Sequence, residues 1–373
     1  MQLLDSLTLQ TSDTSTRQLL ATLRDIAKKV EIKPNFTISH PDYKTIEVSD
    51  EVVARFQKLP LNLQHKFRNS QLCNFLYGIY YNGVLRTALA LDAEPMDSTK
   101  LQNLENNTFL GVDLAFYERL HLANSGEGYF DPGWQVLREE SDGTLAVKKG
   151  QLTVHIKRDH HLLGAEQSAV VGDSVAIKMP RNVVQNGFYM AVSDLGRYIS
   201  SDSNIHQQLV RVYFNLSSEG AVAVMGSLTR QLNAIPIPFT FKALYNPTDY
   251  RRFDTAVLYF GKRNYAVVRQ VLRSVYAECQ PYFGEDVPLF TKWLAPGLAL
   301  AEEPNQKFSK HESFGLNRCQ IIANALLEAW QQGDESKVHR MILIIQHFAR
   351  HGVDLQRPYL NSESDDIYTK LES

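Results

Sequence analysis

Positively charged residues gather around three short segments in the second half of the chain. Arg211 begins the first segment, Lys242 lies inside the second, and Arg252 precedes the third. Surface cations usually need no partner, but a lysine inside the strand-like run FTFKALY must either reach solvent or lie in a site where a group of opposite charge compensates it. Because cations from neighbouring segments can hold one anion together, this arrangement predicts an anion site.

Further cations and two acidic residues follow in the same region. Lys262 comes after the third segment, Lys292 precedes Trp293, and Arg318 lies near the start of a helical pattern. The stretch 295–315 indicates a long loop, which either closes over the site or packs on the surface. Within it, Glu302 and Glu303 can pair with the cations when no phosphate is bound.

The elements that must position these residues follow from periodicity. Ser217 and Ser218 can cap a helix that Pro236 and Pro238 end, and an Asn-Pro loop separates the second segment from the third. Three runs rich in β-forming residues predict strands, namely Arg211–Leu216, Phe239–Leu244 and Ala256–Phe260.

The whole chain of 373 residues indicates an α+β protein. We expect a mainly helical N-terminal region (1–110), an antiparallel β-rich region (111–200), an α/β core with the cationic pocket (201–360) and a polar, mobile tail (361–373). Within these, residues 130–192 predict one antiparallel sheet, and two amphipathic helices, Arg318–Gln331 and Lys337–His351, predict packing on the core sheet.

Composition excludes several classes of partner. A net charge of −2 offers no bulk attraction to nucleic acid or to an anionic membrane. The three cysteines are far apart, and His155, His160 and His161 lack metal-site spacing, so neither a disulfide framework nor a bound metal is expected. The sequence begins without a basic, then apolar, signal pattern and has no long apolar run, which predicts a cytoplasmic protein.

A glycine-containing loop, NSGEGYFDPGW, follows a helical pattern that ends near Asn124. Gly126 and Gly128 can present backbone N–H groups to a ligand, but no GKS or GKT follows, so a nucleotide P-loop is disfavoured. Two interpretations of this loop remain: it is a turn that lines a peptide groove, or it is a turn that only connects two elements.

Four stretches resemble the HopA-type effector family: RVYFNL, FKALYNPTDYRRFDTAVLYFGK, KWLAPGLALAEEP and ESFGLNRCQIIANALLEAW. That family includes type III secreted effectors and many bacterial relatives. Its biosynthetic members act beside a separate kinase as phosphoserine and phosphothreonine lyases in lanthipeptide and thioviridamide-like pathways. The resemblance implies a cofactor-free lyase that converts a phosphorylated precursor peptide to dehydroalanine or dehydrobutyrine, with a core similar to the effector phosphothreonine lyases.

The resemblance also implies residue roles. Lys242 matches the strand lysine that acts as the base, and Tyr213 takes the place of the general acid, because Asn215 stands where those lyases have a histidine. Asn215 has no titrating proton at neutral pH. The residues expected to bind phosphate or substrate are Arg211, Asn215, Arg252, Tyr259, Lys262, Lys292, Arg318, Asn124 and Gly126.

Two other functions remain open at this stage. The missing histidine favours a non-catalytic protein that binds phosphopeptides or partners a kinase. A secreted type III effector is the other possibility, although residues 1–20 show only a Ser/Thr-rich polar start.

Overall fold

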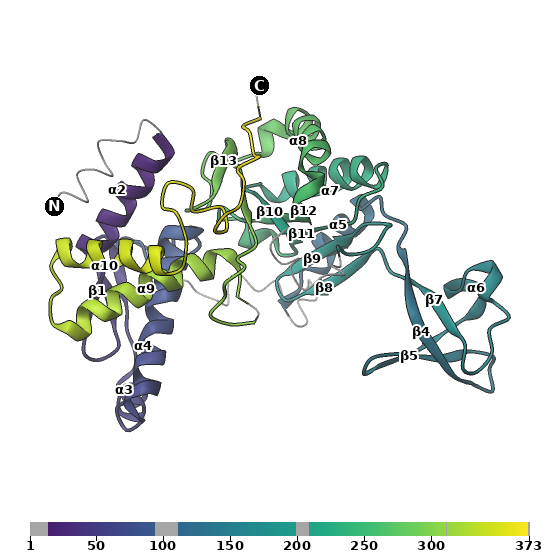
Figure 1. The fold of residues 1–373 in the computed structure, drawn as a ribbon, viewed down its shortest axis with the longest axis horizontal. Coiled ribbons are helices and arrows are strands. Elements are labelled where there is room, and N and C mark those ends of the chain that lie inside the picture. Colours follow the sequence, from purple (N-terminus) through teal and green to yellow (C-terminus); the bar gives the residue numbers. More distant parts are fainter. Residues whose placement is uncertain (1–13, 94–110, 199–208, 311, 372–373) are drawn as a thin grey trace.

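A computed structural model describes residues 14–93, 111–198, 209–310 and 312–371, and it shows the predicted α+β fold (Figure 1). The N-terminal part comprises α2 (Thr14–Lys29), β1 (Glu31–Ile32), β2 (Ile38–His40), β3 (Tyr43–Ile46), α3 (Asp50–Gln57), α4 (Leu61–Leu76) and the π-helical turn η1 (Tyr77–Tyr81). Two C-terminal helices, α9 (Phe314–Gln332) and α10 (Lys337–Arg350), pack against this part. Within the described residues, no helix combines the length and the apolar character needed to cross a membrane.

A seven-stranded antiparallel sheet forms the centre, in the order β13-β14-β10-β12-β11-β9-β8. Its strands are β8 (Asn182–Gln185), β9 (Phe188–Val192), β10 (Leu209–Phe214), β11 (Phe239–Leu244), β12 (Ala256–Gly261), β13 (Lys292–Ala295) and β14 (Leu298–Glu302). The three predicted strands are therefore present and adjacent, as β10, β12 and β11.

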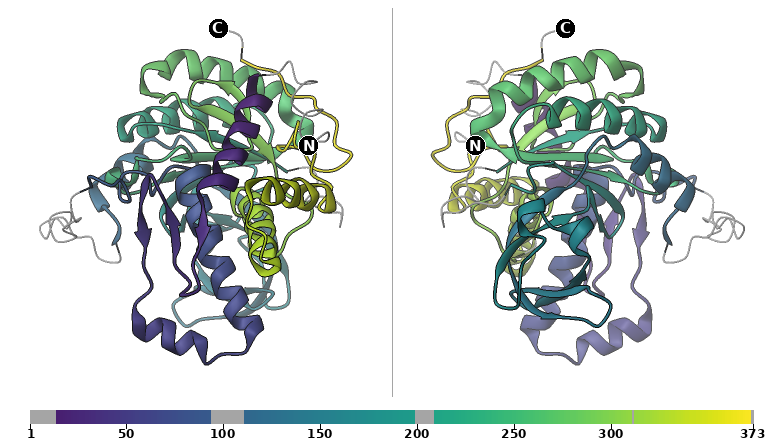
Figure 2. Two further views of the ribbon diagram at one scale, coloured as in Figure 1. Left: turned by 90° about the vertical axis from the view of Figure 1, so that its left-hand side faces the viewer. Right: turned by 90° about the vertical axis from the view of Figure 1, so that its right-hand side faces the viewer.

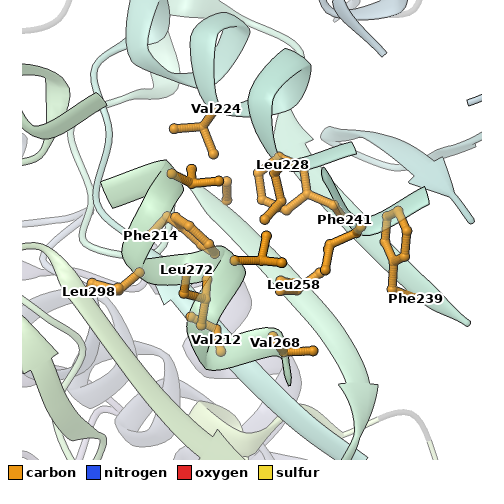
Figure 3. Close-up of a cluster of buried hydrophobic side chains, with 14 of the residues drawn as sticks. Val212, Phe214, Val224, Leu228, Phe239, Phe241, Leu258, Val268, Leu272 and Leu298 are labelled. Carbon is orange, nitrogen blue, oxygen red and sulfur yellow. The ribbon is translucent and has the colours of Figure 1, made fainter. Parts of the chain in front are cut away.

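One face of this sheet, here called the helix face, carries the main hydrophobic core. The register pairs Val212 with Leu258 and Leu258 with Phe241, so these side chains point the same way. They pack beneath α7 (Ser218–Asn233) and α8 (Tyr265–Cys279), as Figures 2 and 3 show. Phe241, Leu258 and Val212 are fully buried, and this packing fixes which residues of each strand face the other way.

The opposite face, here called the Lys242 face, is only partly covered. Tyr213 and Val257 pack against the helical N-terminal part, whereas Arg211, Lys242 and Tyr259 stay partly exposed. The alternation along each strand therefore sends Arg211, Lys242 and Tyr259 away from the main core, and the helices of the N-terminal part cover only part of that face.

The predicted single sheet over residues 130–192 is wrong. A separate four-stranded sheet contains β4 (Tyr129–Glu139), β5 (Leu145–Lys149), β6 (Leu152–Ile156) and β7 (Ser174–Met179), and it lies apart from the central sheet in Figure 1. It has its own small core around Trp134, with the short helix α6 (Arg158–His161) beside it. The following strands β8 and β9 extend the central sheet instead.

Two expectations about the C-terminal half also need correction. The predicted long loop contains β14, whose five residues are all buried and which lies between β13 and β10 in the sheet. The end of the chain is not loosely attached, because Tyr368 and Leu371 are buried in the main core and the Leu371 amide donates to the Leu294 carbonyl.

The N-cap of helix α7 can be tested by mutation. The Ser217 side chain accepts a hydrogen bond from the Gly220 amide, whereas Ser218 begins the helix itself. We expect Ser217→Ala to lower the free energy of unfolding by about 1 kcal/mol, because an N-terminal amide loses its acceptor. Ser218→Ala, the matched control, should change it by less than about 0.5 kcal/mol. Urea unfolding would show the opposite ranking if Ser218 were the cap.

Candidate functional site

The site is built from residues that the sheet register aligns on the Lys242 face. Across the strands, Lys242 pairs with Val257 and Val257 with Tyr213, while Tyr259 pairs with Arg211 in the next row. Paired residues share a face, and neighbouring strands lie about 4.8 Å apart. Lys242, Tyr213, Arg211 and Tyr259 therefore surround one small area of sheet.

The Lys242 side chain lies between aromatic rings. Its Nζ is 4.3 Å from the centroid of the Phe188 ring and 5.5 Å from that of the Tyr259 ring. In the part of the chain that the structure describes, this amine has no carboxylate within ion-pair distance and no hydrogen-bond partner. Aromatic faces stabilise a cation but leave the nitrogen free to meet a ligand.

Arg211 and Lys307 share one buried carboxylate next to this amine. Arg211 Nε donates to Oε2 of Glu303, and Lys307 Nζ donates to Oε1 of the same side chain. The Arg211 guanidinium also lies 5.2 Å from the centroid of the Tyr259 ring, the ring that Lys242 contacts. The pairing of Glu303 with a site cation, expected from the sequence, is thus present in the structure.

Arg252 lies at the rim of the same face. Its guanidinium donates to both carboxylate oxygens of Asp254, with 2.8 Å from Nη2 to Oδ2, and Tyr77 donates to that carboxylate at 3.4 Å. Burial lowers the pKa of Arg252, but Asp254 more than offsets this, so the pKa lies above its ordinary value. The Tyr77 ring stacks on the Tyr81 ring, which contacts the Tyr213 ring edge-on. A chain of three tyrosine side chains therefore connects the Arg252–Asp254 pair to the site.

The Tyr213 hydroxyl is buried and has no hydrogen-bond partner among the described residues, and the same is true of Tyr81. Burial raises the pKa of Tyr213, and the nearby Arg211 opposes the shift without cancelling it. The phenol therefore keeps its proton at neutral pH.

Lys262, Lys292 and Arg318 do not join Lys242. Lys262 Nζ lies 2.8 Å from Glu302 on β14 and also donates to Ser364 near the end of the chain, and Lys292 Nζ lies 2.6 Å from Asp366 in the same C-terminal segment. Arg318 is buried and donates to the Pro358 and Leu360 carbonyls. Each of the three head groups thus has a partner within the fold, and the phosphate-binding roles expected for these residues stay predictions.

Asn215 and the glycine loop also lie elsewhere. Asn215 donates to the Asp286 carbonyl at the end of β10, which ties the strand to the loop after α8. Asn124 is buried and donates to the Arg181 carbonyl and to Tyr189 on the helix face, while its own oxygen accepts from the Gly126 amide. The connecting-turn interpretation of this loop fits these contacts, and the groove interpretation does not.

Sequence patterns missed several residues of the site. Lys307 and Asp254 complete the ion pairs, and Phe188 packs on Lys242 from a neighbouring strand. Only Lys307 carried a usable signal, because it follows Glu303 by four residues. The others required the order of the strands, which the sequence patterns did not give.

A cavity of about 410 Å³ lies away from this site, among α2, the β2–β3 hairpin and η1. Its polar groups bind one another: the His40 ring meets Tyr80 at 2.8 Å, Tyr80 donates to Asp25, and Lys29 pairs with both Asp25 and Asp42. This internally satisfied lining does not suit a phosphate. Within the described ranges, no group of three or more His, Cys, Asp or Glu side chains is arranged to hold a metal ion.

The charge pairing on the Lys242 face predicts a pH effect. Burial raises the pKa of Glu303, but Arg211 and Lys307 more than offset this, so its pKa lies below the ordinary value. Such a carboxylate contributes stability above its unfolded pKa of about 4.3, and the contribution disappears as the pH falls through the folded pKa. Glu303→Gln should therefore lose less stability than the wild type between neutral pH and about pH 3.

Urea unfolding at a series of pH values would measure this effect. Glu118→Gln, at an exposed position on α5 (Leu114–Ala123), is the control and should follow the wild-type curve. Parallel curves for the wild type and Glu303→Gln would show that the buried carboxylate gains nothing from its two cations.

These observations define an α+β protein with a cationic site on one face of a central antiparallel sheet. Residues 179–360 match the model of the HopA1 effector protein family. A search of curated proteins finds no match.

Two solved structures are similar to the chain. One is an effector protein from Pseudomonas syringae pv. tomato strain DC3000, with 16% identity, 67% of this chain and 81% of that chain covered, and a TM-score of 0.39. The other is an effector protein from Pseudomonas syringae pv. syringae strain 61, with 13% identity, 94% and 100% covered, and a TM-score of 0.45.

Proposed function

We propose that the protein is a carbon–oxygen lyase that eliminates phosphate from phosphoserine or phosphothreonine in a peptide. The observation that carries this proposal is the Lys242 amine, which has no carboxylate partner in the described part of the chain although Arg211, Arg252 and Lys307 close by are all paired. An amine that serves as a base must be able to lose its charge, whereas guanidinium groups stay protonated and suit phosphate.

The reaction breaks two bonds and forms one double bond. A base takes the proton from Cα, the electron pair of the C–H bond forms the Cα=Cβ double bond, and the Cβ–O bond breaks as phosphate leaves with its electrons. Positive charge near the peptide carbonyl stabilises the enolate that develops, and cations near the leaving oxygens stabilise phosphate. No water attacks and no metal or cofactor is needed.

Each residue of the Lys242 face has a role in this scheme. Uncharged Lys242 takes the Cα proton, and the guanidinium groups of Arg211 and Arg252 hold the phosphate oxygens. Tyr213 donates its proton to the leaving oxygen, since its hydroxyl has no partner among the described residues. Tyr259 supports both Lys242 and Arg211 through its ring.

The proposed substrate is a ribosomally made precursor peptide that a separate kinase phosphorylates in the cytoplasm. The match of residues 179–360 to the HopA1 effector protein family supports this setting, together with the resemblance to the biosynthetic lyases. The product would carry dehydroalanine or dehydrobutyrine, as in the maturation of lanthipeptide-like natural products.

A second candidate is a protein that binds phosphopeptides without converting them. It is favoured by Asn215, which stands in place of the histidine acid of related lyases and is bound to the Asp286 carbonyl. On this hypothesis the cations hold phosphate, and the raised pKa of Tyr213 keeps its proton from leaving.

Mass spectrometry of synthetic phosphoserine and phosphothreonine peptides separates the two candidates. Elimination removes phosphoric acid, a loss of about 98 Da, and leaves an alkene that a thiol adds to, whereas hydrolysis leaves a heavier product with its hydroxyl. Binding with no mass change would overturn the lyase and support the binding protein.

A further inference from the structure

Glu303 is a buried carboxylate that forms ion pairs with two cations from different parts of the fold. Its side chain is 4% exposed, that of Arg211 is 12% exposed and that of Lys307 is 21% exposed. Arg211 lies on β10, while Glu303 and Lys307 belong to the segment that follows β14. Both carboxylate oxygens are used, one by each cation.

This arrangement has the form of a phosphate site. A phosphate group presents several oxygens to cations that converge from different directions, and a carboxylate presents two in the same way. Among the described residues, Arg211 uses only Nε to bond Glu303, which leaves its two Nη groups for another anion. Lys242, with no carboxylate of its own within those residues, also lies near the Tyr259 ring, with Nζ 5.5 Å from the ring centroid compared with 5.2 Å for the Arg211 guanidinium.

We propose that the Glu303 carboxylate occupies the position in which the substrate's phosphate is held, between Arg211 and Lys307. Lys307 is then a phosphate-binding residue outside the set expected from the sequence, and Glu303 is an internal competitor that must leave when phosphate enters. This inference rests on the proposed function, because it assigns one subsite for the phosphate that the lyase would remove.

Glu302 provides a matched control for Glu303. It is the preceding residue and is equally buried, but it points to the helix face, where Lys262 and Tyr368 hold it at 2.8 and 2.9 Å. Changing either residue to glutamine removes a buried charge from an ion pair, so both variants lose stability. Only the change at Glu303 alters the charge next to Arg211 and Lys307.

Binding of inorganic phosphate tests the subsite without requiring turnover. We expect calorimetry at constant ionic strength to show that Glu303→Gln binds phosphate about tenfold more tightly than the wild type, as for an open state populated about one part in ten. Glu302→Gln should keep the wild-type affinity. Lys307→Met should weaken binding at least about tenfold, since a charge-assisted hydrogen bond is lost. Lys310→Met, at an exposed lysine of the same segment, should not.

The outcomes separate this inference from the lyase itself. Equal or weaker phosphate binding by folded Glu303→Gln, or unchanged binding by Lys307→Met, would overturn the subsite even if phosphopeptides are eliminated. Tighter binding by Glu303→Gln with no elimination of any phosphopeptide would uphold the subsite and overturn the lyase. Circular dichroism and thermal unfolding of each variant show the folded fraction to which the affinities refer.

Discussion

Replacing Lys242 with alanine should abolish elimination while leaving phosphate binding nearly intact. A positioned general base contributes about 10²- to 10⁴-fold to the rate, and no other amine without a carboxylate partner lies on the Lys242 face in the described chain. The phosphate would still meet Arg211 and Arg252. The expected result is therefore a fall in kcat of at least about a hundredfold with a small change in KM.

The measurement is the rate of alkene formation from a phosphothreonine peptide, followed by mass spectrometry. Lys148→Ala removes an exposed lysine from the separate four-stranded sheet and should keep the wild-type rate. Lys242 side-chain packing between two rings is modest, so the variant should fold. Elimination by Lys242→Ala at the wild-type rate would rule out this lysine as the base.

The second large effect concerns Arg318, and it is on stability. Its buried guanidinium donates to the carbonyls of Pro358 and Leu360 and to the Asn317 side chain. Arg318→Met keeps the approximate length but leaves these acceptors without donors, so we expect a loss of about 3 kcal/mol in the free energy of unfolding. Burial lowers the pKa of Arg318 to about 10, so the folded protein still holds the charged form at neutral pH.

Urea unfolding and phosphate calorimetry together decide between the two roles considered for Arg318. The structural role predicts a large loss of stability and unchanged phosphate affinity of the folded protein. Arg357→Met, at an exposed arginine that pairs with Asp354, is the matched control and should lose much less stability. Loss of phosphate affinity without loss of stability would restore Arg318 to the binding site.

Much of the central sheet could be predicted from local pattern. The strand predicted at Phe239–Leu244 has those bounds in the structure, and the strand predicted at Ala256–Phe260 is extended by a single residue. Alternation within FTFKALY also placed Lys242 opposite Phe241, which is buried in the core. These features depend on neighbouring residues in the chain, which is why the sequence alone sufficed.

The errors arose where distant segments decide the outcome. Local pattern predicts Lys262 and Lys292 as further phosphate ligands, but in the structure Lys262 binds Glu302 on β14 and Ser364, and Lys292 binds Asp366. The apolar run that forms β14 is short and lies between loop-like residues, so its place in the sheet depends on pairing with β10 and β13. No local pattern reports such pairing.

The alternation at the end of β14 has a consequence for how this segment tolerates changes in length. Glu302 and Glu303 point to opposite sides of the sheet, where one anchors the end of the chain and the other restrains Arg211. Inserting or deleting one residue between Gly297 and Glu302 would turn each acid toward the wrong set of cations. The number of residues in β14 is therefore constrained as well as their identity. A change in length by one residue would break both the Glu302–Lys262 and the Glu303–Arg211 ion pair.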